Sequence, residues 1–151
     1  MKWTTDRSIK LSIACVFAFS AILLALDVWT LFGWIAPGFG LRPLLDRTYF
    51  AMFSATVAFG SVFAWVCLIN LYRLLKNVQA GRVFTQETAD ILRIISWCCA
   101  GAALVCLISA FYALPFLVVA IAAAFMMLIV RIVKNCFQQA IGMKSELDLT
   151  I

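Results

Sequence analysis

The chain has 151 residues, of which 66% are hydrophobic and 13% are charged. Its mean hydropathy of +1.06 excludes a water-soluble globular domain, because such domains are only about half apolar. The formal net charge of +5 does not indicate direct nucleic-acid binding. The basic residues flank apolar runs, where they meet lipid headgroups, and no basic face with interleaved aromatic residues is present.

Histidine is absent, which removes the commonest general base and the commonest metal ligand. The six cysteines form no Cys-x-x-Cys pair, and five of them lie in apolar runs, so we interpret them as small packing residues. Paired carboxylates are also missing from the apolar runs. We therefore expect no catalytic residues, no metal and no cofactor, and a protein that is not an enzyme.

The first predicted span covers about residues 11–31. It follows a short basic N-terminal segment, named the head from here on, that contains Lys2, Arg7 and Lys10. We do not interpret it as a signal peptide, because the run is about twenty residues long and lacks a clear small-x-small cleavage site. Trp29 and Trp34 resemble interfacial anchors at its far end. A second span, about 49–71, carries a stripe of small residues that would let helix backbones approach closely in lipid: Ala51, Ser54, Ala55, Ala58 and Ser61.

No charged residue lies between Arg93 and Arg131. About 37 helical residues would extend for roughly 55 Å, which is too long for a single crossing of a hydrocarbon core of about 30 Å. Pro115 interrupts this run and predicts a tight hairpin around residues 112–115. The third and fourth spans are accordingly placed at about 94–113 and 115–133.

Residues 72–93, named the elbow from here on, form the one long charged interval between apolar segments. Gly81 predicts the end of the preceding helix, because glycine accepts the left-handed conformation of a C-cap. Thr85 predicts the N-cap of the next helix, with Glu87 in its first turn, where a negative charge suits the helix dipole. Asp90 and Arg93 are spaced to form a weak pair on that helix.

With four spans, the head, the elbow and the C-terminal tail share one side of the membrane. That side holds ten of the twelve basic residues, and Arg42 and Arg47 lie on the other. The positive-inside rule then places both termini in the cytoplasm. The sequence thus predicts an all-α, polytopic membrane protein, with four transmembrane helices arranged as two helix pairs that a cytoplasmic elbow joins.

Asp27 is the only acid inside an apolar run, and an intramembrane carboxylate is a functional candidate. It stands two residues before Trp29, which places it near the outer membrane boundary. We favour an interfacial carboxylate paired with Arg42 or Arg47 over a transport site, since a transport carboxylate would be deeper and in a polar pocket.

The tail, about residues 135–151, changes at Gly142 from a helical pattern to an acidic sequence that we interpret as extended. We hypothesise that it folds back so that Glu146, Asp148 and the terminal carboxylate reach the elbow and the amides near Thr85. The alternative is a frayed terminus.

The elbow and the tail together carry a resemblance. The leucine pattern of residues 71–75, the Gly-Arg-Val-Phe-Thr sequence of 81–85, Glu87, and the end from Glu146 to Ile151 are similar to the YoaS-like bacterial four-span membrane proteins, a domain of unknown function (number twenty-nine seventy-five). Leu147 stands where the family tails have asparagine. The resemblance implies a location in the bacterial inner membrane and, because members are often found beside small helix-turn-helix regulators, a regulatory partner.

Two functions remain open. The first is a non-enzymatic inner-membrane protein that holds or releases a small cytoplasmic DNA-binding regulator. Its proposed contact set is Arg82, Phe84, Thr85, Glu87, Arg93, Glu146 and Asp148. The alternative is a small proton-coupled transporter or resistance protein that uses Asp27, for which a homo-oligomer such as a dimer is compatible. In both cases the lipid bilayer is the main partner.

Overall fold

The computed structural model describes residues 2–36, 46–81 and 85–149, with side chains for 10–36, 46–81, 85–143 and 146. These residues form four α-helices and no strand: α1 (Lys2–Ile35), α2 (Arg47–Gln79), α3 (Gln86–Ser109) and α4 (Pro115–Leu149). Each helix contains a segment long and apolar enough to cross a bilayer. The all-α, four-span fold class is therefore confirmed.

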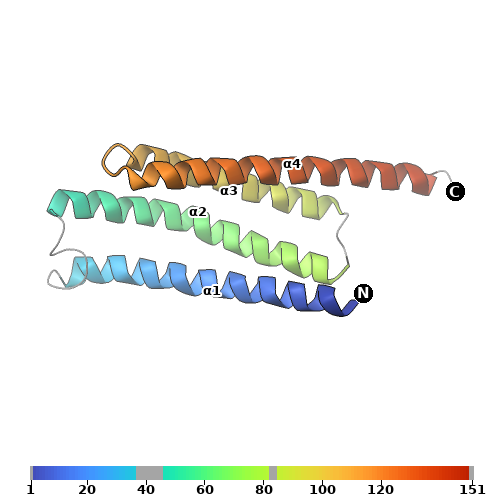
Figure 1. Cartoon of the computed structure of the whole chain (residues 1–151), viewed down its shortest axis with the longest axis horizontal. Helices are drawn as coiled ribbons and strands as arrows, with labels where there is room; N and C mark the ends of the chain where they lie inside the picture. The colour runs from blue at the N-terminus through green and yellow to red at the C-terminus, as the bar shows by residue number, and fades with distance from the viewer. Residues whose placement is uncertain (1, 37–45, 82–84, 150–151) are drawn as a thin grey trace.

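The four helices run antiparallel to their chain neighbours (Figure 1). Both ends of the chain and the α2–α3 connection lie at one end of the molecule, as four spans require. We refer to this as the elbow end, and to the opposite end, with the α1–α2 and α3–α4 connections, as the far end. The start of α3, which Thr85 precedes, also lies at the elbow end, as does the C-terminus (Figure 1).

Each helix packs against the helix that follows it in the chain. The α3–α4 contact is the most extensive, the α2–α3 contact is intermediate, and the α1–α2 contact is the smallest. Within the described part of the chain, no Cα atom of α1 lies within 8 Å of α3 or α4. The helices thus form a row rather than two separate pairs, because α2 and α3 also pack against each other.

The buried side chains concentrate in α3, because this helix lies between α2 and α4. Among the side chains that the structure describes, five of the eight buried hydrophobic residues belong to α3: Ala89, Ile91, Leu92, Ile95 and Cys98. Most other large apolar side chains point outward, as expected where lipid rather than water is the surrounding solvent.

The helix ends follow local sequence chemistry. Gly81 has a φ of 73° directly after the end of α2, in the left-handed region that glycine tolerates. The Thr85 hydroxyl accepts a hydrogen bond from the Thr88 amide at the start of α3, with Glu87 in the first turn. Pro115 is the first residue of α4, a position where its missing amide hydrogen costs nothing. All three predicted end signals are therefore confirmed.

The tail prediction was wrong in its conformation. α4 continues as one helix through the predicted extended end to Leu149 and runs past the other three helices (Figure 1). Gly142 does not end the helix, because one glycine costs only about 1 kcal/mol in a helix interior.

Candidate functional site

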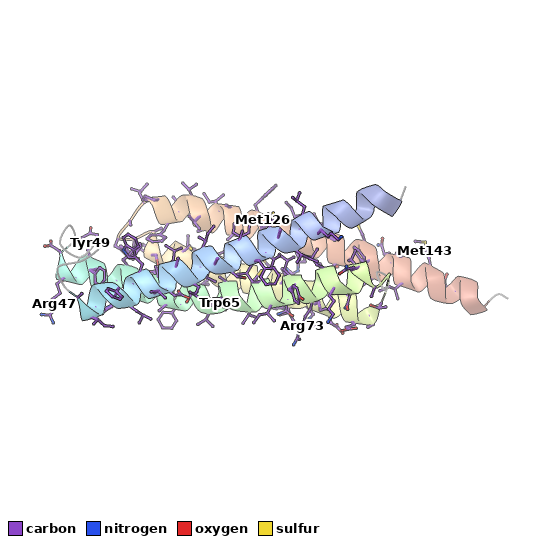
Figure 2. All side chains as sticks on the ribbon, turned by 90° about the horizontal axis from the view of Figure 1, so that it is seen from below. Arg47, Tyr49, Trp65, Arg73, Met126 and Met143 are labelled. Carbon is purple, nitrogen blue, oxygen red and sulfur yellow. The ribbon has the colours of Figure 1, made fainter. Side chains whose placement is uncertain are left out.

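The polar chemistry between α1 and α2 centres on Asp27. The carboxylate oxygen Oδ2 of Asp27 accepts a hydrogen bond of 3.1 Å from the indole nitrogen Nε1 of Trp65. Both side chains are half-buried. Figure 2 shows Trp65 well along α2, far from Arg47 at the beginning of that helix.

Asp27 pairs with Trp65 rather than with Arg47, one of its two predicted partners. Asp27 lies eight residues before the end of α1 at Ile35, which corresponds to about 12 Å of helix. This position is deeper in the helix than that of Trp34, which is next to the end of α1. Arg47 is exposed and is not the partner, and Arg42 lies outside the described residues.

The register between α1 and α2 explains this depth. Trp34 packs against Phe50 with ring centroids 5.7 Å apart, and Phe17 packs against Tyr72 at 6.0 Å. These two aromatic contacts set the antiparallel alignment and bring Asp27 beside the central part of α2. The helix also continues four residues beyond the predicted end of the span at Leu31.

A groove of about 540 Å³ lies beside the Asp27 carboxylate, between α1 and α2. All five members of the predicted small-residue stripe line it: Ala51, Ser54, Ala55, Ala58 and Ser61. The stripe therefore does not bring the helix backbones into contact along its length. It forms the floor of an open groove, while the close approach occurs nearer the far end, where Phe50 packs against Gly33.

The hydroxyl groups in this groove present acceptor oxygens. Thr30 donates to the carbonyl of Asp27 at 2.9 Å, Ser54 to the carbonyl of Ala51 at 2.9 Å, and Ser61 to that of Ala58 at 3.0 Å. Because each hydroxyl hydrogen is donated within its own helix, the oxygen lone pairs remain available to accept a hydrogen bond from a ligand. Among the described residues that line the groove, Asp27 is the only charged group. This arrangement suits a cation or a hydrogen-bond donor.

A second polar cluster, which the sequence analysis did not identify, lies near the far end. The Thr56 hydroxyl is 2.7 Å from the hydroxyl of Ser109 and 2.6 Å from that of Tyr112. Ser109 is only 3% exposed. The cluster joins α2 to the end of α3 and to the α3–α4 turn. No sequence spacing identifies it, because Thr56 is more than fifty residues from Ser109 and Tyr112.

At the elbow end, the structure describes only part of the predicted contact set. Thr85 is engaged in capping, since its Oγ1 is also 3.0 Å from the Oγ1 of the fully buried Thr88. Glu87 and Arg93 are exposed on α3. Among the described residues, the predicted pair between Asp90 and Arg93 does not form. Arg82 and Phe84 lie outside the described residues.

The tail residues of that set are carried by helix α4. Glu146 is exposed, and Asp148 is helical with a side chain outside the described set. The helix does not turn back toward Thr85 before Leu149 (Figure 1). The fold-back of an extended tail is therefore not the arrangement observed up to that residue.

Comparison with known proteins gives one match. The family model described as "Protein of unknown function (DUF2975)" matches residues 7–151, which is nearly the whole chain. No curated protein and no solved structure matches the chain. The chain therefore belongs to this family of four-helix membrane proteins of unknown function.

Proposed function

We propose that this membrane protein holds or releases a small cytoplasmic regulator at its elbow end. One observation carries the proposal: α4 does not stop where its transmembrane segment is expected to end, but continues as a helix to Leu149, past the rest of the molecule (Figure 1). Met143 marks this extension in Figure 2. A helix that projects beyond the other helices offers a rigid docking element for a protein partner.

The charge distribution supports a cytoplasmic location for this end. Ten basic residues lie in the head, elbow and tail, against two in the connection between the first two spans. The positive-inside rule supports a cytoplasmic position for both termini. A reporter that is active only in the cytoplasm should therefore be active when it is fused to either terminus. A terminus on the other face would remove this part of the proposal.

The partner-binding residues follow from this placement. Glu87 and Arg93 on α3 and Glu146 on α4 are exposed, so they are accessible to a partner. The set also includes three residues that are predicted from the sequence and whose side chains the structure does not describe: Arg82, Phe84 and Asp148. Thr85 is assigned a structural role instead, because its hydroxyl is already used for the cap of α3.

The test is co-purification of a small DNA-binding protein with the tagged membrane protein from native membranes. Deletion of residues 145–151 should abolish its recovery. The matched control is Asp46→Asn with Arg47→Gln, which changes exposed charges at the far end and leaves the tail intact. Membrane levels of each variant are measured alongside. Equal recovery with and without the tail would refute the proposal.

A second function, proton-coupled transport, is supported by the geometry of Asp27. A carboxylate on a helix apolar enough to cross the bilayer, beside an open groove of about 540 Å³, is the arrangement that a transporter needs. The acceptor oxygens, the single carboxylate and the adjacent Trp34 ring favour an organic cation as substrate.

Proteoliposomes would test this second function. Ethidium uptake driven by a proton gradient should be lost in Asp27→Asn and retained in Asp46→Asn, an exposed acid outside the groove. Uptake that survives the Asp27 substitution, or no uptake by the unmodified protein, would exclude this function for that class of cation.

A further inference from the structure

The α3–α4 pair contains a polar cleft at the elbow end that shares only Arg93 with the partner-binding residues proposed above. Its volume is about 210 Å³, and two helices supply its walls. The cleft is lined by Arg93, Ser96, Trp97, Met127, Arg131 and Lys134. Three of these six residues are basic, and none is acidic. Most side chains on this pair that face outward are apolar, so the convergence of three cations on one cleft is unusual for its surroundings.

The depth of the cleft matches a lipid headgroup layer. Arg93 lies sixteen residues before the end of α3 at Ser109, and Arg131 lies sixteen residues after the start of α4 at Pro115. Sixteen residues correspond to about 24 Å of helix, counted from the far end. Both guanidinium groups therefore reach the elbow-end boundary of a hydrocarbon core of about 30 Å. Lys134 lies one turn further out.

Trp97 forms part of the inner wall of the cleft. It lies one turn deeper than Arg93 and is 64% exposed, so its ring faces the lipid. Together with Met127 it gives the inner edge of the cleft an apolar wall. The cleft is therefore cationic toward the water and apolar toward the lipid.

The positive charges in the cleft lack a balancing carboxylate. Within the part of the chain that the structure describes, no Asp or Glu oxygen comes within 4.0 Å of Arg93, Arg131 or Lys134. Asp90 is one turn from Arg93 on the same helix and does not pair with it. Like charges that converge without an anion repel one another, so an external anion would relieve this repulsion.

We propose that this cleft binds a phosphate group, and that the phosphate is that of an anionic phospholipid headgroup. The planar guanidinium groups of Arg93 and Arg131 are suited to bidentate hydrogen bonds with phosphate oxygens, and Lys134 adds a point charge. Basic clefts between transmembrane helices at headgroup depth bind such lipids. The apolar wall at Trp97 and Met127 provides a surface for the start of the acyl chains, which free phosphate would not need.

The test measures equilibrium binding of fluorescent phosphatidylglycerol to the purified full-length protein in neutral detergent. The double variant Arg93→Gln with Arg131→Gln should bind about twenty-fivefold more weakly, at about fivefold for each cation removed. The matched control is Arg73→Gln with Lys76→Gln, which removes the same charge from exposed positions on α2 at the same end. It should weaken binding by less than about threefold.

The outcomes separate the sources of phosphate. Equal weakening in both double variants would show only general surface attraction and would overturn the proposal, as would an absence of phosphatidylglycerol binding. Competition by millimolar inorganic phosphate, without binding of the lipid, would assign the cleft to free phosphate and overturn the lipid assignment. If the double variant does not fold, Lys134→Gln alone should give the fivefold loss.

Discussion

The hydrogen bond between Asp27 and Trp65 can be tested by a double-mutant cycle. Trp65→Phe keeps an aromatic ring but removes the indole donor, and Asp27→Leu removes the acceptor at a similar volume. Each single variant leaves one polar group without its partner, whereas the double variant leaves neither. The unfolding free energies of the four proteins therefore isolate the energy of the 3.1 Å contact.

The expected coupling energy follows from the location of the contact. Hydrogen bonds to charged groups contribute about 1.5–3 kcal/mol in water-soluble proteins. In membrane proteins, double-mutant cycles average about 0.6 kcal/mol and reach about 1.7 kcal/mol, because the unfolded chain in the membrane also finds partners. The half-buried position of both side chains places the expected value at about 0.6–1.7 kcal/mol.

Reversible unfolding in mixed detergent micelles would supply the four free energies. The control pairs Asp27→Leu with Trp97→Phe, because Trp97 is exposed on α3 and does not contact Asp27. That pair should be additive within about 0.3 kcal/mol. Additivity of the Asp27 and Trp65 substitutions to the same precision would refute the contact.

Three further predictions concern packing and use the same unfolding measurement. Gly101→Ala places a methyl group 2.5 Å from the Phe63 ring and should lower the unfolding free energy by about 1–3 kcal/mol. The control Gly60→Ala, which meets no atom within 4 Å, should not destabilise the protein. Equal effects of the two substitutions would contradict the α2–α3 contact. Thr85→Ala should cost about 1 kcal/mol through loss of the α3 cap, and a restored value in Thr85→Ser would identify the hydroxyl as the cause. Thr56→Val should cost about 0.6–1.7 kcal/mol by breaking its hydroxyl contacts, and an unchanged stability would show that the cluster does not join α2 to α3.

The features that the sequence predicted correctly depend on local chemistry. Apolar run length identifies the four helices, since lipid demands that each crossing satisfy its own backbone hydrogen bonds. Gly81, Thr85 and Pro115 act on their immediate neighbours, so their roles at helix ends were predictable from the residues alone.

The features that it missed depend on contacts between distant segments. The depth of Asp27 is set by the register of α1 against α2, which aromatic pairs such as Trp34 and Phe50 fix and which no periodicity within α1 encodes. The misjudged tail has a different cause. The acidic sequence after Gly142 was interpreted as extended, yet acidic side chains do not by themselves end a helix, and among the described glycines only Gly81 has a positive φ.

The two chemical sites of the molecule belong to different helix pairs and have opposite charge preferences. The α1–α2 groove presents a carboxylate and acceptor oxygens, whereas the α3–α4 cleft presents three cations at the elbow end. The pairs meet only through α2 and α3, where the Phe63 ring packs against Gly101. α1 has the smallest helix contact, so it is the helix whose displacement costs least. A change at the groove can therefore move α1 without disturbing the α3–α4 pair, while a change at the elbow end acts on the pair that carries the projecting helix.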